Sequence, residues 1–108
     1  MAVLTAQPLA NAGLKPVFSA ASAGGDSFAN TGNEYVHIKN GSASSITVTI
    51  DSVAPCSYGF DHDLAITIPA GEEKLTPRLA RARFNDTDGF VTLTYSASAS
   101  VTVAVIKV

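Results

Sequence analysis

Apolar and polar residues alternate along most of the second half of the chain, which is the pattern of β-strands with one buried face. In Glu34–Asn40 the residues Val36 and Ile38 alternate with polar or amphipathic positions, and Ser45–Asp51 alternates three apolar residues with Thr and Asp. The Asn40-Gly41 pair between the two runs is typical of a tight turn. We therefore predict that these two strands form a β-hairpin.

Shorter alternating runs, separated by turn residues, predict the other strands. A Pro-Ala-Gly turn follows the run that ends at Ile68, and Pro77 ends the next run. With a weaker run at Lys15–Ala20, the chain has about seven strands, which predicts an all-β fold: a small antiparallel β-sandwich, similar to a jelly roll. These other runs are Asp63–Ile68, Glu73–Thr76, Gly89–Ser96 and Val101–Val108.

The inward-facing positions of these strands predict the hydrophobic core between two sheets. Most of them are β-branched, and this residue type favours strands. The predicted core residues are Val36, Ile38, Ile46, Val48, Ile50, Leu64, Ile66, Ile68, Val91, Leu93, Val101, Val103 and Val105.

The beginning of the chain lacks a sustained alternation. Its first residues are rich in Ala and are interrupted by Pro8, and Ala21–Gly32 has the composition of a loop. We therefore divide the chain into an extended N-terminal arm, residues 1–25, and a β-sandwich domain, residues 26–108. We expect the arm to be mobile alone and to become ordered on a partner. Its partner-binding candidates are the apolar residues Val3, Leu4, Leu9 and Leu14.

The composition excludes several classes of function. The 108 residues are 46% hydrophobic and carry a formal net charge of −2, so intrinsic disorder is excluded for most of the chain. Seven Lys and Arg do not exceed nine Asp and Glu, which argues against a nucleic-acid partner. A single cysteine rules out an internal disulfide. Neither a membrane span nor a secretory signal is visible, so we expect synthesis in the cytosol.

Candidate catalytic and metal-binding residues are isolated from one another. Asp61-His62-Asp63 supplies too few ligands for a hard cation, and Asn85–Gly89 lacks the downstream Glu of a calcium loop, so a turn explains it better. His37 lies in the middle of a strand, and Cys56 has no adjacent base. We therefore predict a protein that is not an enzyme and that has no cofactor and no metal.

Basic residues are concentrated in one stretch, which is also the only one suited to a helical turn. Three of the seven basic residues are Arg78, Arg81 and Arg83, and they are interleaved with Leu79 and Phe84. Two interpretations stay open. The arginine stems cover the edge of the sandwich, or the guanidinium groups bind an acidic protein surface.

Five stretches between Asn30 and Ile106 resemble a known family. They are NTGNEYVHIKNGSASSITVTI, PCSYGF at Pro55–Phe60, AITIPAGEEKL, RARFND and VTLTYSASASVTVAVI, within a region of about three-quarters of the chain. This region resembles the small capsid decoration, or cement, proteins of tailed bacteriophages. The resemblance implies a β-sandwich that binds the outer face of an assembled capsid and stabilises it.

The resemblance also implies the partners and the location. The partners would be the major capsid protein and neighbouring copies of the chain in a symmetric dimer or trimer, with no nucleic acid and no membrane. The protein would be made in the bacterial cytoplasm and would reside on the capsid surface of the virion. Two alternatives stay open: another virion β-module of the tail, head-completion apparatus or fibre, and an adhesion sandwich that binds carbohydrate through Tyr58, Phe60 and Asp61.

Overall fold

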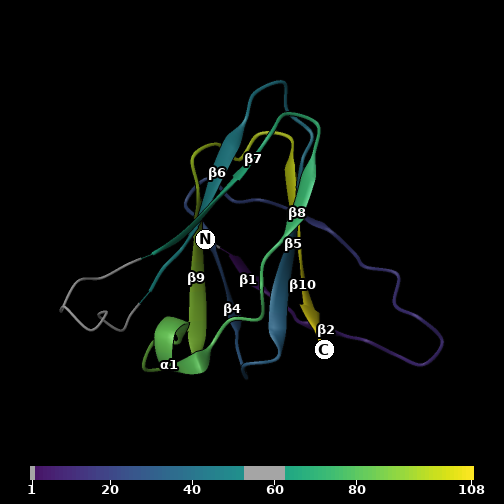
Figure 1. Ribbon diagram of the computed structural model, residues 1–108, viewed down its shortest axis with the longest axis vertical. Helices are drawn as coiled ribbons and strands as arrows, with labels where there is room; N and C mark the ends of the chain where they lie inside the picture. The colour runs from purple at the N-terminus through teal and green to yellow at the C-terminus, as the bar shows by residue number, and fades with distance from the viewer. Residues whose placement is uncertain (1, 53–62) are drawn as a thin grey trace.

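The computed structural model describes residues 2–52 and 63–108. The predictions on Cys56, Tyr58, Phe60 and Asp61-His62 therefore lie outside the described residues. In the described part, ten strands form two sheets, with one helical turn, α1 (Arg81–Phe84), between β8 and β9 (Figure 1). The all-β sandwich that the alternation predicts is confirmed.

The first sheet, sheet A, has five strands in the order β1-β4-β9-β6-β7. All its pairings are antiparallel except the one between β1 and β4. Its strands are β1 (Ala2–Leu4), β4 (Asp26–Ala29), β6 (Ile46–Ile50), β7 (Leu64–Ile68) and β9 (Phe90–Tyr95).

The second sheet, sheet B, has the order β2-β10-β5-β8, and β3 pairs with β10 as well. Only the pairing of β2 with β10 is parallel. Its strands are β2 (Gln7–Pro8), β3 (Ser19–Ala20), β5 (Glu34–Asn40), β8 (Glu73–Leu75) and β10 (Val101–Lys107). None of the described residues forms a helix with the length and hydrophobicity that crossing a membrane requires.

The core lies between the two sheets and follows the predicted pattern. Every predicted core residue is buried except Leu64 and Ile66, which are half-buried because β7 is an edge strand. The core also contains three residues that the alternation does not assign to it: Phe28, Leu79 and Phe84.

The predicted hairpin between β5 and β6 is wrong. The two strands belong to different sheets, and residues 41–45 cross from one sheet to the other. The buried side chain of Asn40 holds this crossing, because its Nδ2 donates to the carbonyl oxygens of Ser44 (2.8 Å) and Ile68 (3.0 Å) while its Oδ1 accepts from Ser42 N–H (3.0 Å). The apolar faces of β5 and β6 therefore both line the core, one from each sheet.

The N-terminal segment is extended, but its structure differs from the expected separate arm. β1 lies along β4, while β2 and β3 lie along β10, so hydrogen-bond partners expected on another protein are found within the chain. Leu4 and Ala6 also pack against the core. Runs of two or three residues suffice here, because an edge strand offers unpaired N–H and C=O groups that a short extended segment can use. Residues 2–8 thus bridge the edges of both sheets.

Candidate interaction surface

Exposed apolar side chains gather on and beside the N-terminal segment. Five large hydrophobic side chains of the described residues are exposed, and Leu75 on β8, at the opposite edge of sheet B, is one of them. The other four define what we call the N-terminal surface: Val3 (67% exposed), Leu9 (52%), Val17 (71%) and Val108 (56%).

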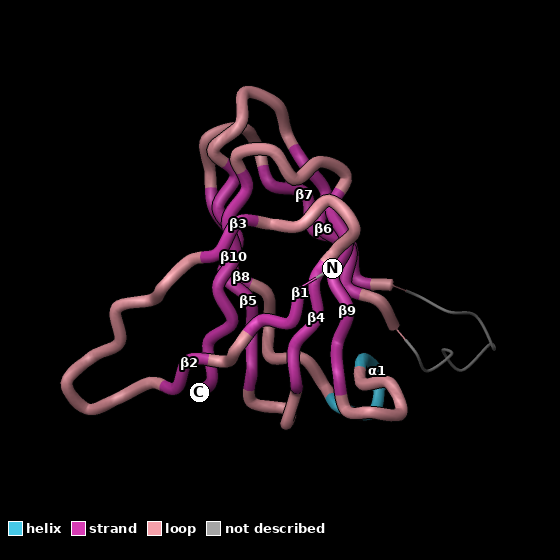
Figure 2. Tube along the Cα trace, turned by 180° about the vertical axis from the view of Figure 1, so that it is seen from behind, coloured by secondary structure: helices cyan, strands magenta, loops and turns pink. Residues whose placement is uncertain are grey.

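Backbone pairing brings these four residues to one side of the sandwich. Val3 and Val17 line the same shallow hollow, together with Gln7. Leu9 N–H donates to the Lys107 carbonyl (3.0 Å), which places Leu9 beside the end of the chain. Figure 2 views the molecule from the side of β1, β2 and β3. The N-terminal surface therefore lies along the edges where both sheets receive the first residues of the chain.

A second hollow lies between β1, the beginning of β5 and the end of β10. Its lining includes Val3, Thr31, Glu34 and Lys107. The Glu34 side chain is buried, and its Oε1 accepts hydrogen bonds from Thr31 N–H (2.9 Å), Thr31 Oγ1 (2.8 Å) and Asn33 N–H (3.0 Å). This carboxylate thus holds the β4–β5 turn.

Phe18 fastens the N-terminal segment to the outer face of sheet B. Its ring meets His37 edge to face at 5.0 Å between centroids, and Lys39 Nζ lies 4.1 Å from the ring centroid. His37 Nε2 is also 3.2 Å from Glu73 Oε1, although the two are not aligned for a hydrogen bond. His37 is therefore a strand residue, as the sequence predicts, and the structure adds the Phe18 ring that packs against it.

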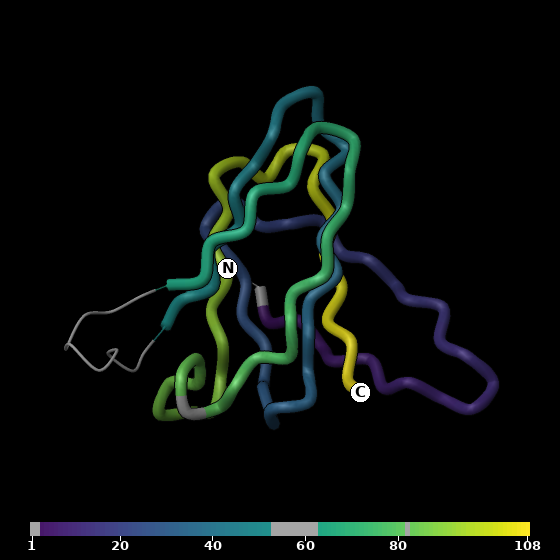
Figure 3. The backbone as a smooth tube through the Cα atoms, viewed as in Figure 1, coloured from purple at the N-terminus to yellow at the C-terminus, as the bar shows by residue number. Residues whose placement is uncertain are grey.

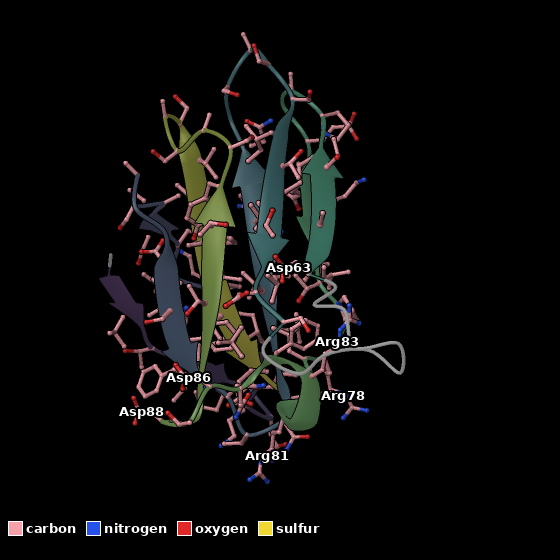
Figure 4. The ribbon with its side chains drawn as sticks, turned by 90° about the vertical axis from the view of Figure 1, so that its left-hand side faces the viewer. Asp63, Arg78, Arg81, Arg83, Asp86 and Asp88 are labelled. Atoms are coloured by element: carbon pink, nitrogen blue, oxygen red, sulfur yellow. The ribbon has the colours of Figure 1, made fainter. Side chains whose placement is uncertain are left out.

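The three arginines lie at the end of the sandwich, around α1. Leu79 and Phe84 are buried and anchor this turn, whereas all three arginines are exposed. The Arg83 guanidinium lies over the Phe84 ring, with Cζ 4.7 Å from the ring centroid, and the Arg81 stem borders Gly32. Figure 4 shows that the three arginine side chains point in different directions and do not converge on one point. The helical turn is as predicted, and the arrangement suits a broad acidic surface better than one anion.

The segment that follows α1 is a turn built from Asn and Asp side chains. Asp86 Oδ1 accepts from the backbone N–H groups of Asp88 (2.8 Å) and Phe90 (3.0 Å). The amides of Asn30 and Asn85 bond to one another at 2.7 Å and tie the turn to the β4–β5 loop. These bonds explain the residue pattern that resembles a calcium loop, and no cluster of three metal-ligating side chains occurs within residues 2–52 and 63–108.

A polar pair of the buried Asp26 and the half-buried Tyr95 closes the other end of sheet A. Tyr95 Oη donates to Asp26 Oδ2 (2.7 Å), which also accepts from Ser22 N–H (3.2 Å). Burial raises the pKa of Tyr95 above its usual value of 10.0, and the hydrogen bond and negative charge of Asp26 raise it further. The pair thus stays a neutral phenol on a carboxylate, a structural link between β4 and β9.

The structure separates the predicted partner-binding residues into two roles. Val3 and Leu9 are exposed, whereas Leu14 is half-buried, and Leu4 packs on the core and so anchors the segment. The prediction omitted Val17 and Val108. Val17 lies in the weak run at Lys15–Ala20, and Val108 is the last residue of the run Val101–Val108.

The N-terminal surface and the arginines flank the same loop, residues 30–33. Gly32 borders the Arg81 stem, Asn33 O accepts from Val108 N–H (2.9 Å), and Thr31 lines the hollow under β1. The two predicted contact regions are therefore neighbours at one end of the molecule. Comparison of the chain with protein-family models, curated proteins and solved structures found no match.

Proposed function

We propose that this protein is a structural virion protein that binds the outer surface of an assembled bacteriophage capsid and stabilises it, without enzymatic activity or a bound cofactor. The observation that supports this most is the N-terminal surface, where four of the five large apolar side chains that are exposed among the described residues gather. Apolar side chains clustered in this way mark sites of protein–protein interaction. The class of partner, a capsid, comes from the sequence resemblance of the strand segments to capsid decoration proteins.

The energetics favour a partner that presents many equal sites. Complete burial of a Val or Leu side chain contributes ~1.5–3 kcal/mol, and these side chains are already partly covered, so each adds ~1–2 kcal/mol. The four together contribute ~4–8 kcal/mol, which is similar to the cost of association itself. One copy therefore binds weakly by this surface alone. Contacts with neighbouring copies on a repeating shell raise the total affinity.

The arginines add a second, electrostatic contribution. They lie beside the N-terminal surface and spread over a wide area, which fits an acidic region of the major capsid protein. In this proposal the protein is made in the bacterial cytoplasm, assembles onto the shell and resides on the capsid surface of the virion. Its partners are the major capsid protein and neighbouring copies of itself.

Binding to purified shells tests the proposal. The major capsid protein encoded in the same genome is assembled into shells, and co-sedimentation measures the bound protein. We expect the wild-type chain to saturate the shells at a fixed number of copies. Val3→Asp with Val17→Asp should lower the affinity at least about tenfold, because two apolar contacts are lost and two charges are buried.

The matched control is Leu75→Asp, which also changes an exposed apolar residue but lies on β8 at the far edge of sheet B. Its affinity for the shells should equal that of the wild type. Absence of wild-type binding would contradict the proposed function, and equal losses in both variants would contradict the role of the N-terminal surface. Binding to tail tubes instead of shells would favour another virion module.

A further inference from the structure

The loop between β2 and β3 stands away from the sandwich. Residues 9–13 are all exposed, and a Cβ added to Gly13 would meet nothing within 4 Å. Figure 3 shows the loop as the purple projection that leaves the body near the C-terminus and returns higher up. Few contacts therefore hold this loop in its path.

Residues 2–4 and 7–9, in contrast, are held by pairing with other strands. β1 pairs with β4 and β2 with β10, and Leu9 N–H donates to Lys107 O (3.0 Å). The Gln7 amide clamps the base of the loop, because its Nε2 donates to Val17 O (2.8 Å) and its Oε1 accepts from Val17 N–H (2.9 Å). All these contacts join residues 2–9 to parts of the chain that follow the loop.

The same contacts form if residues 2–9 come from a second copy. Only the path of residues 10–16 changes, and seven extended residues span up to ~24 Å. The thinnest dimension of the molecule is 21 Å, so the loop can reach the edge strands of an adjacent copy. We infer that two copies of the chain exchange their N-terminal segments, each inserting residues 2–9 between the sheet edges of the other. The exchange does not depend on the proposed function.

The backbone of the loop decides between the closed and the exchanged form. In the closed form the chain reverses at a turn in which Gly13 N–H donates to Ala10 O (2.9 Å), and Gly13 has φ 90°. A β-branched residue is strained at this φ although it meets no atom there. In the exchanged form the loop is extended and needs no positive φ. Gly13→Val therefore penalises the monomer and spares the dimer.

Light scattering coupled to size exclusion measures the dimerisation constant of the full chain over a range of concentrations. We expect Gly13→Val to raise the association constant of the dimer about 5- to 30-fold for each hinge. A dimer has two hinges, so the total increase is roughly 25- to 900-fold. The matched control is Gly71→Val, because Gly71 has φ 74°, also has nothing within 4 Å and lies in the β7–β8 turn. It should destabilise the chain without promoting dimers.

Disulfide trapping shows whether the dimer is exchanged. Val3 is the register partner of Ser27, so Val3→Cys and Ser27→Cys are placed in separate chains, each with Cys56→Ser, and the chains are mixed and oxidised. A disulfide between the chains forms only by exchange. We expect this disulfide in chains that carry Gly13→Val. We also expect it at high concentration in chains with the wild-type Gly13, so the test remains valid if the Gly13→Val chain does not fold. Monomers throughout, or dimers without the cross-link, would overturn the inference.

Discussion

Replacing Phe28 with Ala tests the packing of the sandwich most sharply. Phe28 lies on β4, is fully buried and is among the largest side chains of the core. A buried Phe→Ala change costs ~3–5 kcal/mol, through lost burial and the cavity that remains. A chain of this length has a free energy of unfolding of about 5–15 kcal/mol, so the variant loses a large share of its stability. At about 4 °C per kcal/mol, its Tm falls by roughly 12–20 °C.

The matched control is Phe18→Ala, which removes the same ring from the outer face of sheet B. Phe18 is half-buried and contacts His37 and Lys39, so we expect a loss of only about 1–2 kcal/mol from partial burial and the cation–π contact. Urea denaturation followed by circular dichroism, together with calorimetry, gives both values. Equal losses in the two variants, or a loss below about 1 kcal/mol for Phe28→Ala, would refute the reasoning that places Phe28 in the core.

Three further predictions concern pH, salt and metal. The free energy of unfolding should decrease as the pH rises above about 10, because Tyr95 has a raised pKa in the folded state and loses its proton more easily once unfolded. Denaturant titrations should show a smaller decrease for Tyr95→Phe than for the wild type, whereas Tyr35→Phe should show the same decrease as the wild type. Binding to capsid shells should weaken as salt rises from about 0.05 to 0.5 M, and Arg81→Ala should reduce this dependence in co-sedimentation, whereas an unchanged dependence would remove the arginines from the interface. Chelation by EDTA should leave the Tm unchanged in a thermal scan, and a fall that calcium reverses would assign a metal site near Asp86.

Long alternating runs made the central strands predictable. β5 has the predicted bounds, Glu34–Asn40, and the inward residues of β6, β9 and β10 are buried as expected. The pairing of β5 with β6 was not predictable in the same way, because the Asn40-Gly41 pair fits both a hairpin and a crossing between sheets. Contacts with β9 and β10, which lie far along the chain, decide between the two.

The first two strands and the burial pattern of β4 could not be predicted from the sequence. Three successive residues of β4, Asp26 to Phe28, are buried, so no alternation marks them. β1 and β2 have two or three residues each, and neighbouring edges rather than propensity hold them, whereas β3 lies at the end of the predicted run Lys15–Ala20. The same holds for the candidate surface. Val3 and Leu9 could be proposed from their apolar character, whereas Val17 and Val108 join them only through tertiary pairing.

Electron cryo-microscopy of shells incubated with the wild-type chain tests the proposed function most directly. The shells are those of the major capsid protein from the same genome, and the bound chain is fitted into the additional density. We predict density on the outer face at symmetry-related positions, with Val3, Leu9 and Val17 against the shell or a neighbouring copy and the β7–β8 turn directed outward. Shells without additional density would contradict capsid decoration, and a chain attached through β7 and β8 would contradict the N-terminal surface as its anchor.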